Sequence, residues 1–245
     1  MTRAIVKPFD AFCDADVLIA SLTRSMLLFA SQIGAPFRLR WSRMAEAEAD
    51  RHTRPPRSKV SDLRVKSDWG DKTLVKPAAD DRMSELVDTQ LKDRHIIAAA
   101  HQAKIPIIVT RNVSDFGTAD LKRWHMSAVH PDAFATVMIV APVYRELLIT
   151  LAHHRSQPPN DPSSIHAAIG KEHPTLFRAM EELFPGVVAD LGSNDPPKYL
   201  HRGQCCYLCG RDFESDQVSY LGVHSDCMSA IADCTVLNSA KWTVY

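Results

Sequence analysis

LKDRHIIAAAHQAKIPIIVTRNVSDF, residues Leu91–Phe116, reads as a helix, a buried strand and a polar loop in quick succession. Asp93 opens an alanine-rich helical run, where the positive end of the helix dipole favours an anion. Pro106–Thr110 is a short apolar, β-branched run that predicts a buried strand. Asn112 and Asp115 then follow that strand, and ligand sites of open α/β sheets lie beyond the carboxyl ends of strands. Taken alone, the two acids also fit an ordinary helix start and an ordinary turn.

The composition describes a chain with enough apolar residues for a core and no overall charge. At 245 residues it can hold one large domain, or one medium domain with small additions. Apolar residues make up 45% and the formal net charge is zero, so the whole molecule gives no electrostatic case for nucleic acid. We see no apolar run of roughly 18 residues and no secretory signal at the N-terminus. We therefore expect a cytoplasmic protein without a membrane partner.

Two acids interrupt the first apolar run of the chain. Ala11–Ala20 reads as the first strand, and alternation places Asp14 and Asp16 on one face of it. A carboxylate in a central strand is costly to bury without a partner or a metal, which makes these acids more informative than surface acids. In the alternative interpretation the strand begins at Val17 and both acids lie in a turn.

The next segments predict two helices joined by a short link. Ser21–Gly34 carries a helical stripe of apolar residues and ends in a glycine. Arg38–Trp41 is interpreted as the link, and Ser42 as the N-cap of a helix that runs to about Arg51. Within it Glu46 and Glu48 lie two residues apart and therefore on different faces, so at most one should point to an inward site.

His52–Lys76 is predicted to be a long, mobile, basic loop, since it contains prolines and a glycine and little apolar periodicity. Between Arg38 and Lys66 nine basic residues stand against four acidic ones. Such a loop could hold a phosphate backbone, and it fits a solvated loop equally well.

The rest of the chain is predicted to be mainly helical up to a linker. We expect a helical segment over 80–87, a short strand over 125–129, and a helical region over 131–155 that breaks at Pro142. Two short helices divided at Pro174 follow over 165–184. The glycine- and proline-containing stretch 188–203 is the best candidate for a domain boundary.

A cysteine and histidine pattern near the C-terminus predicts a zinc site. The pairs Cys206-x2-Cys209 and His224-x2-Cys227 have the ligand types and spacing of tetrahedral zinc. Five of the six cysteines lie between positions 205 and 234, and a reduced cytosolic cluster binds metal more often than it forms disulfides. Four protein ligands leave no open position, so the predicted site is structural rather than catalytic.

Several details of this site stay open. Cys205 could replace Cys206 as a ligand, and Cys234 is a spare cysteine. Phe213 and Tyr220 could form the small core of the module. The alternative to a metal site is a cluster of unrelated thiols.

Acids stand at several predicted loop ends of the α/β core. Mg²⁺ and Mn²⁺ prefer oxygen ligands, and Mg²⁺ uses only a few carboxylates plus water. Carboxylates packed close together repel one another unless a cation neutralises them. The acids concerned are Asp14, Glu46 or Glu48, Asp93 and Asp115. Their spacing in the sequence does not by itself show that they lie close together in the folded protein.

Four short motifs, in this order and spacing, resemble those of PIN-domain nucleases. Over about Lys7–Pro185 the chain is similar to bacterial PIN proteins of the toxin–antitoxin, VapC-like kind. The motifs are DADVL at Asp14–Leu18, Arg40–Ser42 followed by Glu48, DRHIIAAA at Asp93–Ala100, and Val109–Asn112 followed by Ser114–Phe116.

The resemblance implies a three-layer α/β/α domain with a parallel sheet, a divalent metal in an acidic cluster, and endoribonuclease activity on RNA. It also implies an antitoxin protein as a partner, whose segment occupies the active-site groove, and dimerisation, which is frequent among PIN domains. With it, the expected divisions are a nuclease domain over 1–140, a helical extension over 141–187, a linker over 188–202 and a zinc module over 203–232.

The resemblance also assigns roles to single residues. Glu48 is the choice for the second acid because of its distance from Trp41 and Ser42, and Glu46 is the alternative. Asp16 stands at a position that is usually not an acid, and we expect it behind the ligands. The ligands of Mg²⁺ or Mn²⁺ are then Asp14, Glu48, Asp93 and Asp115, with Asn112 beside them as a polar helper.

Two other functions compete with the nuclease. One is a non-catalytic PIN-like module for RNA or protein contact, with the zinc module as the partner surface. The other is a different Mg²⁺-dependent α/β hydrolase, but the DxDxT pattern of a phosphatase does not follow Asp14. The zinc module is unusual for the toxin resemblance and could give the nuclease a substrate or a partner.

Overall fold

The chain folds around a six-stranded sheet that is parallel except at one edge. The computed structural model describes residues 8–66, 70–78, 80–154, 160–189, 200–213 and 221–238. Five strands run parallel, and the strand nearest the C-terminus adds an antiparallel edge. This arrangement confirms the predicted α/β class. In spatial order the strands are β3 (Leu74–Val75), β2 (Phe37–Ser42), β1 (Phe9–Cys13), β4 (Ile107–Val109), β5 (Ser127–Val129) and β6 (His201–Arg202).

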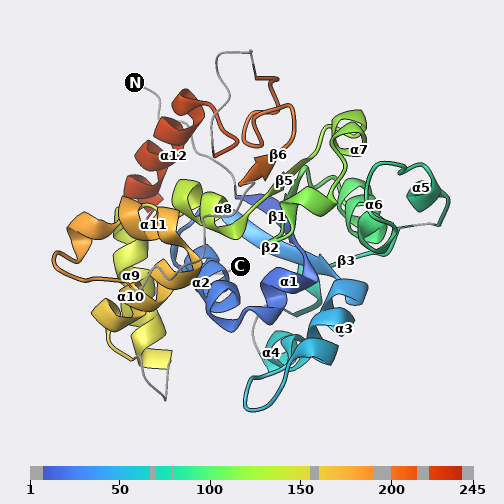
Figure 1. Cartoon of the computed structure of the whole chain (residues 1–245). Helices are drawn as coiled ribbons and strands as arrows, with labels where there is room; N and C mark the ends of the chain where they lie inside the picture. The colour runs from blue at the N-terminus through green and yellow to red at the C-terminus, as the bar shows by residue number, and fades with distance from the viewer. Residues whose placement is uncertain are drawn as a thin grey trace.

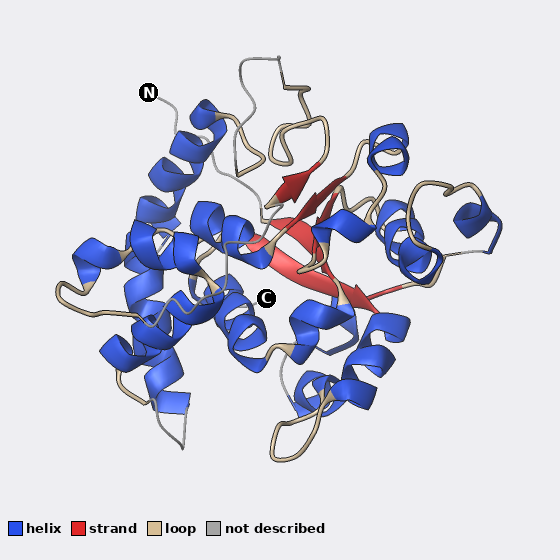
Figure 2. Cartoon of the chain, viewed as in Figure 1, coloured by secondary structure: helices blue, strands red, loops and turns tan. Residues whose placement is uncertain are grey.

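Helices cover both faces of the sheet and give it three layers, as Figures 1 and 2 show. Alternation along β1 illustrates the reason, since Ala11 and Cys13 face one hydrophobic cluster while Phe12 faces the other. One face packs on α2 (Ser21–Ile33), α3 (Arg43–His52), α8 (Pro131–Met138) and α9 (Ala141–His154), and the other on α6 (Arg94–Gln102) and α7 (Thr118–Arg123).

The remaining helices are short or lie toward the C-terminus. They are α1 (Ala15–Ile19), α4 (Val60–Lys66), α5 (Asp80–Ser84), α10 (Pro162–Glu172), α11 (Pro174–Ala179) and α12 (Ser225–Asn238). Four 3-10 turns complete the described structure, η1 (Gly70–Thr73), η2 (Leu91–Asp93), η3 (Val113–Asp115) and η4 (Glu181–Leu183).

The helical region after β5 breaks where a proline was predicted to break it. The axes of α8 and α9 differ by 115°. Among the described residues, no single helix is long and apolar enough to cross a membrane, although this bent pair reaches the required length and composition when taken together. Asp132 on α8 accepts hydrogen bonds from the amides of Thr175 and Leu176, each 3.0 Å long, and thereby caps α11.

The sequence-based prediction of the first strand was wrong. The strand is β1, which ends at Cys13, and Asp14 is the N-cap of α1 rather than a strand residue. Asp16 lies within α1, so the alternative start at Val17 is wrong as well. The physical reason is that the Asp14 carboxylate accepts the amide of Ala15 and so favours a helix start over continued pairing.

Two other segments predicted to be irregular contain regular structure. The expected link Arg38–Trp41 lies within strand β2, where Leu39 and Trp41 are buried. Arg38 hides this pattern in the sequence because it faces solvent and pairs with Asp10 on β1. The expected loop 52–76 contains α4, η1 and β3.

Strand β6 lies within the stretch 188–203 that was predicted to be a domain boundary, but several other elements agree with the sequence-based predictions. α2 ends at Gly34, and the Ser42 hydroxyl accepts the Ala45 amide at the start of α3. β4, β5 and α11 lie within their predicted ranges, with Pro174 as the first residue of α11, and α10 begins at Pro162, just before its predicted start. These elements were predictable because their signals are local.

Two buried histidines should make the protein sensitive to mild acid. Burial, followed by the charges of His130 and Arg111, lowers the pKa of His173 to about 3, and burial lowers that of His130 to about 4. Their folded pKa values lie below the unfolded value, so their contribution to stability is complete above about pH 6.5 and is lost as the pH falls toward 4. For each histidine this loss is about 2 kcal/mol between pH 7 and pH 5.

When the pH falls from 7 to 5, the free energy of unfolding of His173→Gln should therefore decrease by about 2 kcal/mol less than that of the wild type. Urea unfolding of both proteins at pH 7 and pH 5 measures the difference. Glutamine can still hydrogen-bond Thr23, whose hydroxyl lies 2.8 Å from Nε2 of His173. Equal losses in both proteins would show that His173 is not buried in its neutral form.

Candidate active site

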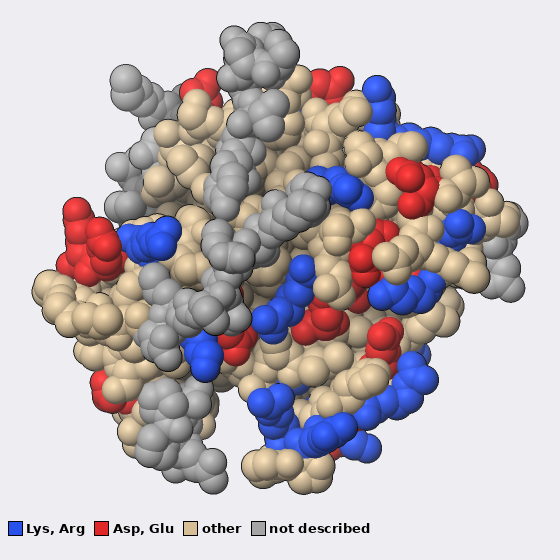
Figure 3. Space-filling view, viewed as in Figure 1, with Lys and Arg blue, Asp and Glu red and all other residues tan. Residues whose placement is uncertain are grey.

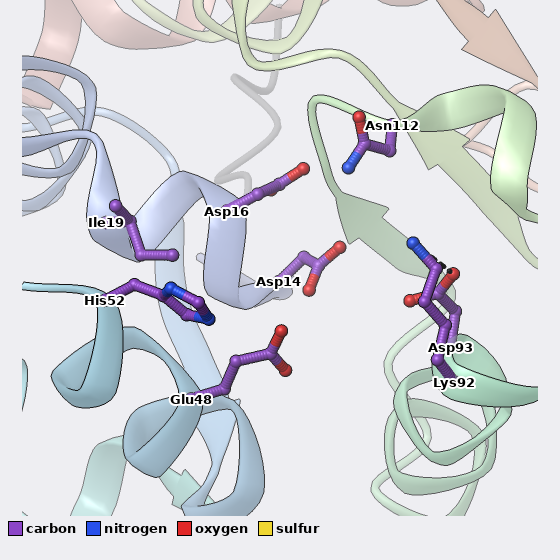
Figure 4. A pocket seen from close by; sticks show the side chains of 8 residues that line it. All are labelled: Asp14, Asp16, Ile19, Glu48, His52, Lys92, Asp93 and Asn112. Carbon is purple, nitrogen blue, oxygen red and sulfur yellow. Dashed lines mark ion pairs between the residues drawn. The ribbon is translucent and has the colours of Figure 1, made fainter.

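A cavity of about 240 Å³ lies at the carboxyl ends of β1 and β4. It is flanked by α1 and α3 on one side and by the start of α6 on the other (Figure 4). Four acids from three segments far apart in the sequence reach it. The lining residues are Asp14, Asp16, Ile19, Glu48, His52, Lys92, Asp93 and Asn112.

Asp14 is held in one orientation at the end of β1. Its Oδ1 accepts the Ala15 amide at 2.6 Å and its Oδ2 accepts the Thr110 hydroxyl at 2.9 Å. Burial, with the charge of Asp16 next in size, raises the pKa of Asp14 to about 8. A carboxyl with so high a pKa lacks a positive partner, and a bound cation would supply one.

Asp16 takes part in the site more closely than the sequence suggested. Its Oδ2 accepts the Arg111 amide at 2.9 Å and the Thr110 hydroxyl at 3.3 Å. Its Oδ1 is buried and has no hydrogen-bond partner. Burial raises the pKa of Asp16 to about 6. The spacing of two from Asp14 was the available signal, but it was interpreted on a strand instead of a helix.

The structure separates the two glutamates of α3. Glu46 is buried and pairs with Arg64, whose Nε lies 2.7 Å from Oε2, and it also accepts the Trp41 indole N–H at 3.1 Å. Glu48 lines the cavity and points toward the space in front of Asp14 (Figure 4). Glu48 is therefore the glutamate available to a ligand, and Glu46 joins α3 to α4.

Asp93 approaches the cavity from the opposite side (Figure 4). Its Oδ2 lies 3.8 Å from the ammonium of Lys92, which lies 3.2 Å from Oδ2 of Asp115. Burial raises the pKa of Asp93, and hydrogen bonding to Asp115 together with the charge of Asp93 raises that of Lys92. Asp115 is not among the cavity-lining residues and instead accepts hydrogen bonds from Lys92 and Gln90.

A second carboxylate fixes the backbone that leads to Asp93. Asp120 on α7 accepts the amides of Val87, Asp88 and Thr89 at 2.7 to 3.1 Å. Its own burial acts to raise its pKa, but these hydrogen bonds outweigh burial, so the pKa of Asp120 is lowered. Gly117 is required here because an added Cβ would lie 2.5 Å from the Asp88 backbone. The segment before Asp93 is thus anchored on α7.

The residues that line the cavity fit a hard divalent cation. They offer carboxylate and amide oxygens, the ligands that Mg²⁺ and Mn²⁺ prefer. Two buried oxygens, Oδ1 of Asp16 and Oδ2 of Asp93, have no hydrogen-bond partner. Among the described residues these carboxylates do not form a closed metal-binding cluster and instead surround the cavity.

Charge on the surface changes sign around the cavity. In Figure 3 acidic side chains gather around the end of α1, while Lys and Arg lie over α3, α4 and the segment between them. Arg54, Arg57 and Lys59 are exposed in that segment, and Arg51 is exposed in the last turn of α3, next to the cavity-lining His52.

The C-terminal pattern forms the predicted cluster. Ligand atoms of Cys206, Cys209, His224 and Cys227 all lie within 4.8 Å of one another, so the cluster could bind a metal. Gly210 provides the turn after Cys209 with a φ of +72°, and its amide donates to the Cys206 carbonyl.

The thiol chemistry of this cluster suits a metal. Burial acts to raise the pKa of Cys209, but hydrogen bonds from Arg211 and His224 outweigh it and lower the pKa to about 6. A thiolate is the form that ligates zinc. Cys205 lies outside the cluster, so Cys206 is the ligand candidate of this pair. Tyr220 and the Cys234 side chain lie outside the described residues.

Comparison with known proteins gives one partial likeness. A protein of Mycobacterium tuberculosis (strain ATCC 25618 / H37Rv), described as "Putative ribonuclease VapC50", is 30% identical to the chain over 103 residues. The match covers 40% of this chain and 60% of that relative. No protein-family model matches the chain, and no solved structure matches it. Over this part, the chain is therefore similar to a protein described as a VapC ribonuclease.

Proposed function

We propose that the chain is a metal-dependent endoribonuclease that hydrolyses RNA phosphodiester bonds. The observation that carries this proposal is the set of four carboxylates around one cavity at the strand ends, of which Asp14 is buried and two, Asp16 and Asp93, each have a buried oxygen without a hydrogen-bond partner. The partial likeness to a protein described as a ribonuclease supports the choice of RNA. Asp14, Glu48 and Asp93 would hold Mg²⁺ or Mn²⁺, with Asp16 beside them.

A bound Mg²⁺ or Mn²⁺ would lower the pKa of a water molecule and offset charge on the reacting phosphate. The chain's own residues would orient the reactants. The Thr110 hydroxyl holds the Asp14 carboxylate in place, and the Asn112 amide faces the cavity as a hydrogen-bonding group. Lys92 offers an ammonium to a phosphate oxygen, and Asp115 orients that ammonium rather than serving as a ligand.

The exposed basic segment after α3 would carry the RNA backbone into the cavity. The double variant Arg54→Glu, Arg57→Glu should weaken RNA binding and reduce the slope of log K against log salt by about 1.4, since each phosphate contact contributes about 0.7 for a single strand. Fluorescence anisotropy with a labelled single-stranded RNA, at several salt concentrations in EDTA, measures both quantities.

A matched control reverses two exposed charges elsewhere, Arg145→Glu on α9 and Lys171→Glu on α10. This control lowers the net charge by the same amount but should retain most of the affinity and the full salt slope. Equal losses in the two double variants would assign the effect to net charge and contradict a defined RNA path.

The proposed activity is tested with purified full-length protein and RNA. Cleavage of transfer or ribosomal RNA fragments in Mn²⁺ or Mg²⁺, and its absence in EDTA, is the expected result. Binding without cleavage would favour the second candidate, a non-catalytic RNA-binding module. One observation favours that candidate, because Lys92 already partly neutralises Asp93 and Asp115.

The toxin role is a further part of the proposal, and its partner would be an antitoxin protein. Induced expression in a bacterial host should arrest growth in the wild type but not in Asp14→Asn. Expression of the neighbouring open reading frame should relieve the arrest.

We also propose that the Cys/His cluster holds Zn²⁺, because four sulfur and nitrogen ligands are typical of structural zinc.

A further inference from the structure

Strand β6 connects the Cys/His cluster to the sheet that carries the candidate active site. It pairs antiparallel with β5, with Val129 opposite His201 and Ala128 opposite Arg202. The hydrogen bond from the His130 amide to the Leu200 carbonyl, 2.8 Å long, extends this pairing. The two side chains of β6 point to opposite faces of the strand, so each can engage a different part of the molecule.

His201 is enclosed by the module that contains the Cys/His cluster. Its ring centroid lies 6.2 Å from that of Tyr207 and 5.9 Å from that of Phe213. A Cβ added at Gly222 would lie 2.5 Å from Cγ of His201, so the backbone just before His224 closes directly on this ring. Packing therefore fixes β6 to the segments that carry the four candidate ligands.

Arg202 engages the loop after β4. Its Nη1 donates to the carbonyl oxygens of Ser114 at 2.9 Å and Phe116 at 2.8 Å. These carbonyls belong to η3 and the residue after it, in the same loop as Asn112 and Asp115. A charged donor that bridges two carbonyls holds them at a fixed separation.

The other side of the module rests on the main core. Cys206 and Tyr207 are buried, and the ring centroid of Tyr207 lies 6.4 Å from that of Phe134 on α8. The module thus lies between the core and the loop. A metal that closes the Cys/His cluster would stiffen the module because it would cross-link the segment of Cys206 and Cys209 to the segment of His224 and Cys227.

We propose that the metal-loaded Cys/His module clamps the loop 112–116 through Arg202, which acts as a positioning residue for the candidate active site. The effect on catalysis rests on the proposed nuclease function. The effect on the loop does not rest on that function, because it follows from the hydrogen bonds of Arg202 to Ser114 and Phe116.

Hydrogen exchange of the full-length protein in Mg²⁺ buffer tests the clamp. The readout is the peptide that contains the amides of Asp115, Phe116 and Gly117, each of which has an acceptor in the structure. Arg202→Ala should raise its exchange rate by about 10-fold through easier local opening. Arg202→Lys, which keeps the charge but has a shorter side chain without the planar guanidinium, should give a smaller increase. Arg145→Ala, an exposed arginine on α9, should give none.

Loss of the C-terminal metal is tested by Cys209→Ser, so that Mg²⁺ stays in the buffer. This variant should raise exchange of the same peptide by a similar factor. The double variant Cys209→Ser, Arg202→Ala should exchange no faster than Cys209→Ser, because both changes release the same contact. The clamp would be overturned if the two substitutions had additive effects on the exchange rate of this peptide. It would also be overturned if Arg202→Ala left the exchange rate unchanged.

RNA cleavage supplies the second readout. Arg202→Ala should lower kcat by about 10-fold with KM nearly unchanged, because the loop is displaced while the RNA path is intact, and Arg202→Lys should recover part of the loss. A wild type that cleaves no RNA would refute the proposed function, and the exchange result would still decide the clamp. Cleavage with an equal kcat in Arg202→Ala and the wild type would overturn the positioning role.

Discussion

Asp14→Asn is expected to lower kcat/KM for RNA cleavage by on the order of 100-fold or more, because loss of a residue behind the metal ligands already costs 10- to 100-fold. The substitution keeps the shape of the side chain and an oxygen that accepts the Ala15 amide, and the Thr110 hydroxyl can accept from the new amide nitrogen while it donates to Asp16. It removes the charge that would hold the cation. Asp93→Asn should have a similar effect from the opposite side of the cavity. Initial rates in Mn²⁺ with a labelled RNA measure both losses.

The Asp14 variant should remain folded. In the metal-free protein the folded pKa of Asp14, about 8, lies above its unfolded value of 3.8, so ionisation costs stability as the pH rises between these values. Asparagine cannot ionise and avoids this cost. Thermal unfolding in EDTA at pH 8 should therefore show the variant to be at least as stable as the wild type.

The two glutamates of α3 provide a matched control for the same prediction. Glu48→Gln should lose cleavage and keep stability, because Glu48 lines the cavity. Glu46→Gln should keep cleavage and lose stability by about 3 kcal/mol, because it removes the negative charge from a buried ion pair with Arg64. Equal cleavage by the wild type and Glu48→Gln would contradict the assigned site.

Metal removal from the Cys/His cluster is expected to unfold residues 203–230 and to leave the N-terminal domain folded. Metal binding would supply most of the folding free energy of so short a segment, on the order of 10 kcal/mol. The remaining five strands of the sheet are parallel and do not depend on β6 for their order. Limited proteolysis after treatment with a chelator should cut within this segment and spare the rest.

Adjacent cysteines give the control for this second prediction. Cys206→Ser should lose metal and open the segment, whereas Cys205→Ser should keep both metal and fold, since Cys205 is buried outside the cluster. Zinc content per chain, measured by mass spectrometry, separates the two variants. A metal-free protein with the protease resistance of the loaded one would contradict a metal-dependent module.

The inner strands β4 and β5 were predictable because their signals are short-range, whereas β2, β3 and β6 were not predicted. The α6–β4 stretch has an alanine-rich helix and an apolar strand in direct succession, and both form as expected. The Cys/His spacing was sufficient to predict the cluster because each short segment already holds two candidate ligands close to each other. β2 was missed since Arg38 and Arg40 interrupt its apolar pattern, and their partner Asp10 lies on a different strand.

The site itself was predicted less completely because its geometry depends on distant segments. The ligand role of Asp115 stays a prediction, and the structure places Asp115 outside the cavity lining and beside Lys92, a lysine to which sequence reasoning gave no role. Asp16 was placed behind the ligands, and it lines the cavity. The contact of Arg202 with Ser114 spans 88 residues, and no local pattern encodes it.

The most direct test of the account is the chemistry of the RNA ends produced in Mn²⁺ in water enriched with ¹⁸O. A metal-activated water predicts linear phosphate ends that carry one ¹⁸O atom, no 2′,3′-cyclic phosphate, and no products in EDTA or with Asp14→Asn. Cyclic phosphate ends, or cleavage that persists in EDTA and in Asp14→Asn, would contradict hydrolysis by a metal held in this cavity.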